Sequence, residues 1–213
     1  MVLLVASPAF ADPAASVNKY RAAAGLAAVS VDAKLSAGCA KHADYLKKNF
    51  GSDAIAGLAA HKEQMDLPGA STAGADCGKN ADLFVGVADL DKAVDAFMAG
   101  IYHRRPVLDP GLATIGIGTA KLADGTFVLA VRLSAAGTHA AGWPVAYPAD
   151  RQTEVPLEYG NEIPNPVPGG APAGYPITLQ FPPFDKLTAV SAKCSFWAWY
   201  VTGTYSGLLA LNR

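Results

Sequence analysis

Charge is scarce in this chain, and so are the features that mark several large classes of protein. Only 16% of the 213 residues are charged, and 17 Lys and Arg against 18 Asp and Glu give a net charge of −1. No basic cluster indicates a nucleic-acid-binding surface, and no apolar run reaches the ~18 residues of a membrane-spanning helix. Hydrophobic residues make up 51%, which predicts a folded domain with a sizeable core.

The motifs of common catalytic and nucleotide-binding sites are also missing. The sequence has no Gly-x-Ser-x-Gly, no His-Glu-x-x-His and no phosphate-binding loop. Gly116-x-Gly118 lies in a strand-like run with no helix expected after it, so it does not indicate a dinucleotide site. These absences favour a protein without catalytic activity.

Cysteine is rare, and its use depends on the cellular compartment. Residues 1–11 are typical of the end of a secretory signal, because an apolar run finishes in the small-x-small site Ala9-Phe10-Ala11. Export to the extracellular space or the periplasm would permit a disulfide. Of the three cysteines, Cys39 and Cys77 share the N-terminal region and Cys194 lies far away. We predict a Cys39–Cys77 bridge; the alternative is three buried free thiols.

The apolar periodicity predicts three helices. The first is expected to begin at Ser16, whose hydroxyl could cap it, and the second at Asp32. The third is expected over residues 90–102, with Asp89 or Asp91 as its cap.

A β-hairpin is predicted after these helices. Residues 114–122 and 126–133 are two β-prone runs, and Asp124-Gly125 between them favours a turn in which both residues have positive φ. Residues 52–82 have no clear period and are expected to form a long loop layer with one short helix. Helices that flank an antiparallel sheet give an α+β domain, which we place at residues 12–141.

The composition changes in residues 142–213. Prolines are frequent, short β-prone pieces lie between them, and helical periodicity is absent. The pattern is typical of an immunoglobulin-like β-sandwich, which needs ~100 residues. We therefore expect a Pro-rich linker and a partial, β-rich segment.

Five features in one order carry a resemblance to a known family. Residues 18–26 (NKYRAAAGL) are similar to an N-x-x-R-x-x-x-G-L helix, and His61 and Gly78-Lys79-Asn80 follow on the loop layer. His103 comes next, and Ile115-Gly116 begins the expected strand twelve residues after it. Together they resemble a bacterial-type member of the CAP superfamily of cysteine-rich secretory, antigen 5 and pathogenesis-related proteins. The resemblance implies a three-layer α-β-α sandwich.

The resemblance also implies a ligand cleft, in which His61 and His103 can hold a divalent metal. Lys79 stands where the family carries an acid in Gly-Glu-Asn, so we expect zinc to bind weakly or not at all. Glu63 could supply an acid, because residues two apart on an extended segment point the same way. For His103, a structural hydrogen bond to the following loop is an alternative. The expected cleft residues are His61, Glu63, Lys79, Asn80, His103 and Arg104.

Three functions are consistent with these features. We favour a secreted, non-enzymatic protein whose cleft binds a small lipid, a sterol or a cell-wall-derived ligand. The alternatives are a hydrolase that acts on peptide or cell-wall substrates through acid/base or metal-assisted chemistry, and a structural surface module.

Overall fold

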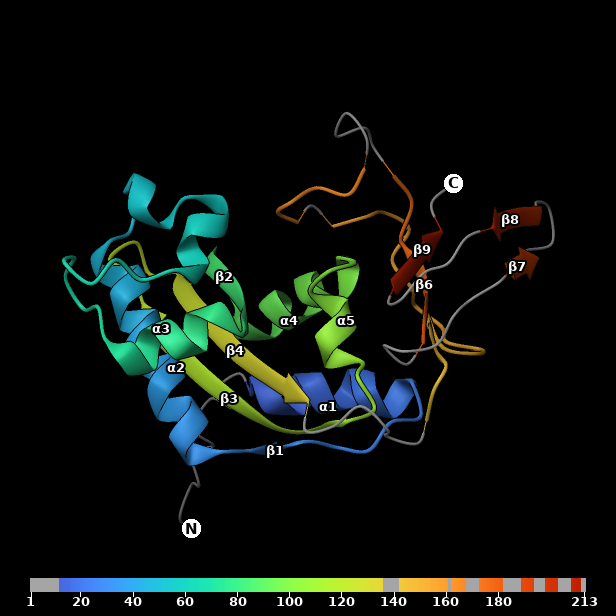
Figure 1. The fold of residues 1–213 in the computed structure, drawn as a ribbon, viewed down its shortest axis with the longest axis horizontal. Coiled ribbons are helices and arrows are strands. Elements are labelled where there is room, and N and C mark those ends of the chain that lie inside the picture. The colour runs from blue at the N-terminus through green and yellow to red at the C-terminus, as the bar shows by residue number, and fades with distance from the viewer. Residues whose placement is uncertain are drawn as a thin grey trace, which may run out of the picture.

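A four-stranded sheet forms the centre of the computed structural model, which describes residues 12–135, 142–160, 162–167, 173–181, 189–193, 198–202 and 208–211 (Figure 1). The strand order is β1-β3-β4-β2. Strand β1 runs parallel to β3, and the other neighbours are antiparallel. The predicted signal remnant, residues 1–11, lies outside the described residues. The strands are β1 (Ser30–Val31), β2 (Ala81–Val87), β3 (Leu112–Lys121) and β4 (Phe127–Ala135).

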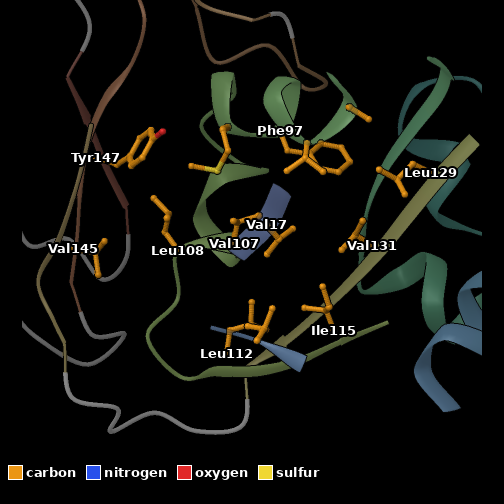
Figure 2. Close-up of a cluster of buried hydrophobic side chains, with 14 of the residues drawn as sticks. Val17, Phe97, Val107, Leu108, Leu112, Ile115, Leu129, Val131, Val145 and Tyr147 are labelled. Carbon is orange, nitrogen blue, oxygen red and sulfur yellow. The ribbon is translucent and has the colours of Figure 1, made fainter. Parts of the chain in front are cut away.

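Helices cover both faces of this sheet, and the alternation of side chains along β4 shows why. Leu129 and Val131 join the core under α1, α4 and α5, whereas Val128 and Ala130 face α2 and α3. All four side chains are fully buried, as expected for a strand with a layer on either side. Figure 2 shows the first of these cores, with Val17 and Val107 between Phe97 and Leu112. The α+β, three-layer α-β-α prediction is confirmed. The helices are α1 (Pro13–Ala23), α2 (Ala33–Lys48), α3 (Thr72–Lys79), α4 (Leu90–Ala99) and α5 (Arg104–Val107).

The first helix begins one turn before the predicted position. Asp12 is its cap and accepts a hydrogen bond from the Ala14 N–H at 3.0 Å, and Pro13 occupies the first helical position, where its missing N–H costs nothing. The predicted cap, Ser16, lies inside the helix and donates its hydroxyl to Asp91 on α4 at 2.7 Å. Asp32 and Asp89 cap α2 and α4 as predicted.

The third predicted helix, residues 90–102, ends three residues early, and a separate short helix follows it. α4 ends at Ala99, Gly100 follows in an extended conformation, and α5 begins at Arg104. His103 therefore precedes a short helix instead of ending a long one. The break leaves main-chain N–H groups that a continuous helix would use internally available to other partners.

The predicted hairpin is present, with a different turn. β3 pairs with β4 from Leu112 to Ala135, but only Gly125 has a positive φ, at +90°. Its N–H donates to the Leu122 carbonyl at 3.2 Å, so the turn is of the common type with a glycine bulge and does not need positive φ at Asp124.

The expected loop layer, residues 52–82, contains more regular structure than predicted. Two short 3₁₀ helices, η1 (Asp53–Ile55) and η2 (Gly57–His61), precede α3, and β2 begins at its end. The sequence reading missed β2 altogether. Its burial does not alternate cleanly, and Asp82 and Gly86 interrupt the apolar pattern.

The segment after Gly142 adds β structure and packs on the domain. Val145 and Tyr147 are buried in the same core as α1 and α4, and Figure 2 shows both beside Leu108. The described strands are β5 (Val145–Tyr147), β6 (Ile177–Gln180), β7 (Ala189–Lys193), β8 (Ala198–Thr202) and β9 (Leu208–Leu211), in sheets β5-β6-β9 and β7-β8. That these strands belong to a partial immunoglobulin-like sandwich stays a prediction. Across the described ranges, no helix is both long and apolar enough to cross a bilayer.

Candidate functional site

A cavity of about 250 Å³ lies between the 3₁₀ segment, β2, α4 and the segment that carries Glu162. Most of its wall is apolar. The polar side chains on it are two imidazoles and one carboxylate, so the cavity has the composition of a small-molecule site. The lining residues are Ile55, Gly57, Leu58, Ala60, His61, Leu83, Phe84, Val85, Ala96, Phe97, His103, Glu162 and Ile163.

His61 reaches the cavity from the end of η2, as the sequence predicted. Its Nδ1 lies 2.9 Å from the carbonyl oxygen of Gly78. Because a carbonyl can only accept, Nδ1 carries the hydrogen and donates it. In the neutral imidazole, Nε2 is then an unprotonated acceptor.

The Cys39–Cys77 disulfide supports this contact. The bridge is present as predicted, with a Cα–Cα distance of 5.1 Å, and it joins α2 to α3 immediately before Gly78. Both half-cystines are fully buried. The bridge therefore fixes the end of α3, from which Gly78 accepts the hydrogen bond of His61.

His103 lies on the same cavity wall and is paired with Glu162. Its Nδ1 is 2.8 Å from Oε2 of Glu162, and the two side chains are 18% and 3% exposed. The imidazole also stacks on Phe97, with ring centroids 5.5 Å apart and planes 9° apart. An ion pair and a stacked ring together fix the orientation of this histidine.

The Glu162 carboxylate also closes the break between α4 and α5. It accepts from three successive main-chain N–H groups, those of Ile101, Tyr102 (3.0 Å) and His103 (3.3 Å). A Cβ on Gly100 would lie 2.5 Å from Oε2, so only glycine leaves room for the carboxylate. The glycine is thus part of the site.

The charges of this pair follow from its contacts. Burial lowers the pKa of His103, but the hydrogen bond to Glu162, the carboxyl group of Asp82 when it is ionised and the negative charge of Glu162 outweigh it, and the net pKa is raised. Burial raises the pKa of Glu162, but His103 and the main-chain donors bring it below its ordinary value. The pair is therefore ionised near pH 6, and His103 presents donors rather than an acceptor.

Asp82 on β2 is a further acid that interacts with the pair. Burial and the negative charge of Glu162 raise its pKa to about 8, although the positive charge of His103 opposes this shift. Its Oδ2 has no hydrogen-bond partner among the described residues. The carboxyl group therefore keeps its proton at neutral pH to a large extent.

Glu63, contrary to expectation, does not line the cavity. Its carboxylate is buried and lies 2.9 Å from Nδ1 of His42 on α2, and it accepts from the Ser71 N–H at 2.6 Å. Burial lowers the pKa of His42 although Glu63 raises it. The pair fastens the chain just after His61 to α2, so Glu63 supports the site from outside it. His42 is fully buried.

Three other predicted cleft residues also lie off the cavity wall. Lys79 and Asn80 at the end of α3 are exposed, and only the neighbouring Gly78 carbonyl contacts a cleft histidine. Arg104 is fully buried. It donates to the carbonyl oxygens of Met98 (2.7 Å) and Pro176 (2.6 Å), and so joins α4 to the C-terminal segment.

Weak or absent zinc binding stays a prediction, and the nitrogen ligands on the cavity wall are those of His61 and His103. Both histidines use Nδ1 internally, which would leave Nε2 of each for a metal. Glu162 is occupied by His103 and three N–H groups, and no group of three or more His, Cys, Asp or Glu side chains within the described ranges is arranged to hold a metal. Two imidazoles are fewer than the three or four ligands zinc normally has.

Sequence reasoning did not find Glu162. It follows the predicted domain, is 59 residues from His103, and stands in a proline-rich stretch without periodicity. Nothing local distinguishes it from the exposed Glu158.

Comparison with known proteins gives one match. Residues 14–133 fit the family model described as the cysteine-rich secretory protein family, CAP, which spans more than half of the chain. A search of curated proteins found no match. The matched region contains both cavity histidines and ends before Glu162.

Proposed function

Since this chain belongs to the cysteine-rich secretory protein (CAP) family, we propose that it is a secreted, non-enzymatic protein that binds a small ligand in the cavity between His61 and His103. The ligand would be a lipid, a sterol or a cell-wall-derived molecule with an apolar part and a polar end. An extracellular or periplasmic location is supported by the family and by the buried disulfide.

The observation that carries the proposal is the separation of apolar and polar side chains on the cavity wall. Nine of the lining residues are aliphatic or aromatic: Ile55, Leu58, Ala60, Leu83, Phe84, Val85, Ala96, Phe97 and Ile163. The polar groups are confined to His61, His103 and Glu162. Apolar walls with a few convergent polar groups are the usual composition of ligand pockets.

The polar groups also restrict the polar end of the ligand. The imidazolium of His103 can donate from Nε2, and the Nε2 of His61 can accept when that imidazole carries its one hydrogen on Nδ1. While Glu162 remains bound to His103, a hydroxyl group, which both donates and accepts, matches this pair. The volume, about 250 Å³, is below the roughly 300–1,000 Å³ of pockets for drug-sized ligands, so a sterol would be buried only in part and one short chain more fully.

Mass spectrometry of molecules extracted from the exported protein tests this function. We expect an amphipathic small molecule in about equimolar amount. Protein that is folded and carries no such molecule, and that gains none when exposed to lipid or cell-wall extracts, would contradict the proposal.

A hydrolase is the second candidate, and one observation favours it. The His103–Glu162 pair next to His61 is an arrangement that can move protons in acid/base catalysis. However, no Ser, Thr or Cys is among the residues that line the cavity, so water would have to be the nucleophile. Cleavage of peptide or cell-wall substrates by the wild-type protein, abolished in His61→Ala, would decide for this candidate.

A further inference from the structure

The turn between α4 and α5 has the composition of an anion site. Three consecutive N–H groups, from Ile101 to His103, and the imidazole of His103 point at one carboxylate. Successive main-chain N–H groups around one centre form a concave site for anions. These donors lie in the turn before α5 and are not part of a helix.

The carboxylate in this turn comes from outside the family domain. The match ends at residue 133, and Glu162 is held between the turn and the cavity. Its remaining polar contact is the Tyr159 hydroxyl, which donates to Oε1 at 3.4 Å. The family domain thus carries the donors, and the later segment supplies the acceptor.

The described residues around Glu162 include exposed apolar side chains and few hydrogen bonds to α4. Leu157 is 88% exposed and Ile163 is 61% exposed. Besides Glu162, the hydrogen bond that joins this stretch to α4 is a long one, from the Gly160 N–H to the Ala99 carbonyl at 3.4 Å. The buried carboxylate, charge-assisted on several sides, is therefore the main polar attachment of this stretch to the cavity.

We propose that the α4–α5 turn is a carboxylate-binding site, and that Glu162 occupies it as an internal ligand. Ligands that carry a carboxylate beside an aliphatic group compete with Glu162 for the turn while their apolar part enters the cavity. This identification of the ligand class rests on the proposed binding function. The tether gives Glu162 a high effective concentration, so free carboxylates bind well only when Glu162 is removed.

Chemical rescue of Glu162→Ala tests the site. Acetate is too small to fill the apolar cavity, so it reports on the turn alone. We expect acetate to bind this variant with a dissociation constant in the millimolar range and to raise its melting temperature. Neutral acetamide and equimolar chloride should do neither, and the wild type should not respond to acetate.

Glu158→Ala is the matched control, because it removes one acid from the same stretch without vacating the turn. It should behave as the wild type. A folded Glu162→Ala that responds to acetate no more than to acetamide, or no more than Glu158→Ala does, would overturn the inference. Glu162→Ser, which retains one polar group, is tested in parallel. If Glu162→Ala is unfolded in chloride, acetate should restore its fold, and failure to restore either variant would also overturn it.

Longer carboxylates separate this inference from the proposed function. From acetate to propionate to butyrate, affinity should rise about fourfold per methylene if the chain enters an apolar cavity. Acetate binding without this gain would support the carboxylate site and contradict the cavity. Binding of butanol and butyrate with equal affinity, without any response to acetate, would support the cavity and overturn the carboxylate site.

Discussion

The carboxylate of Glu162 lies 2.8 Å from Nδ1 of His103, although 59 positions separate the two residues in the sequence. This contact joins the last part of the cavity wall to the family domain. It also fixes the protonation state of a histidine that lines the cavity, because the pKa of His103 is raised and that of Glu162 is lowered. The protonation state of this cavity histidine therefore depends on a residue that the family match does not include.

Replacing Glu162 by Gln should lower the pKa of His103, because the negative charge is lost and a hydrogen bond to a neutral amide oxygen raises the pKa less than one to a carboxylate does. Because the pKa of His103 is raised on folding, its protonated imidazole stabilises the fold below pH 6.5. This stabilisation is lost as the pH rises through the pKa of the folded state. Because the pKa of Glu162 is lowered on folding, its carboxylate stabilises the fold above pH 4.5. This stabilisation is lost as the pH falls through the pKa of the folded state.

The substitution should therefore cost most between pH 4.5 and 6.5, by about 2 kcal/mol. Imidazole NMR titrations and denaturant unfolding measure the two effects. Glu158→Gln is the control. An unchanged His103 titration would show that the pair is not ionised.

Asp82→Asn should stabilise the protein at pH 8. The folded pKa of Asp82, about 8, is above its ordinary value of 3.8, so the native state holds a proton that the unfolded state releases. Stability of the wild type then falls as the pH rises from about 4 to 8, and asparagine removes this loss.

We expect a gain of about 1–3 kcal/mol at pH 8 and little difference at pH 4, by denaturant unfolding. Asp66→Asn, at an exposed position, should change neither value. A loss at pH 8 would mean that ionised Asp82 stabilises the charge of His103 by more than its burial costs.

Gly118→Ala should destabilise the fold by about 3 kcal/mol or more. Its Cβ would lie 2.0 Å from the main-chain carbon of Cys39 on α2, so β3 and α2 would have to separate. Gly174→Ala, whose Cβ would find its nearest atom at 3.8 Å, is the control. Equal melting temperatures for the two variants would contradict the close packing of α2 on β3.

Removing the disulfide with the double variant Cys39→Ser and Cys77→Ser should reduce stability by up to about 4 kcal/mol, because the bridge closes a loop of 38 residues. The Gly78 carbonyl would also lose its fixed position, so the orientation of His61 should become heterogeneous. Denaturant unfolding and the His61 NMR signals are the measurements. A single, unchanged His61 signal would show that α3 is held without the bridge.

The features that the sequence predicted correctly depend on residues close together in the chain. Asp32 and Asp89 cap helices through N–H groups within three positions, and the hairpin at Gly125 follows from a local turn. His61 and His103 were found through a family spacing, and both line the cavity.

The features that were missed depend on distant contacts. Strand β2 carries a buried acid, Asp82, whose environment comes from His103 and Glu162, so its apolar pattern is broken. The early end of α4 at Gly100 is stabilised by Glu162, about sixty positions away. Glu63 and Arg104 were placed in the cleft because they are near the histidines in the sequence, yet their side chains bond to α2, α4 and the C-terminal segment.

The most direct test of the binding function fills the cavity from α4. Ala96 lines the cavity, and Lys92 is exposed on the same helix, so Ala96→Trp places an indole in the cavity and Lys92→Trp places one away from it. The measurement is the amount of small molecule that co-purifies with each exported protein, by native mass spectrometry. We predict equal loading of the wild type and Lys92→Trp and at least a tenfold loss in Ala96→Trp, with all three folded. Equal loading of Ala96→Trp and Lys92→Trp would contradict the account, because the ligand would then bind somewhere other than this cavity.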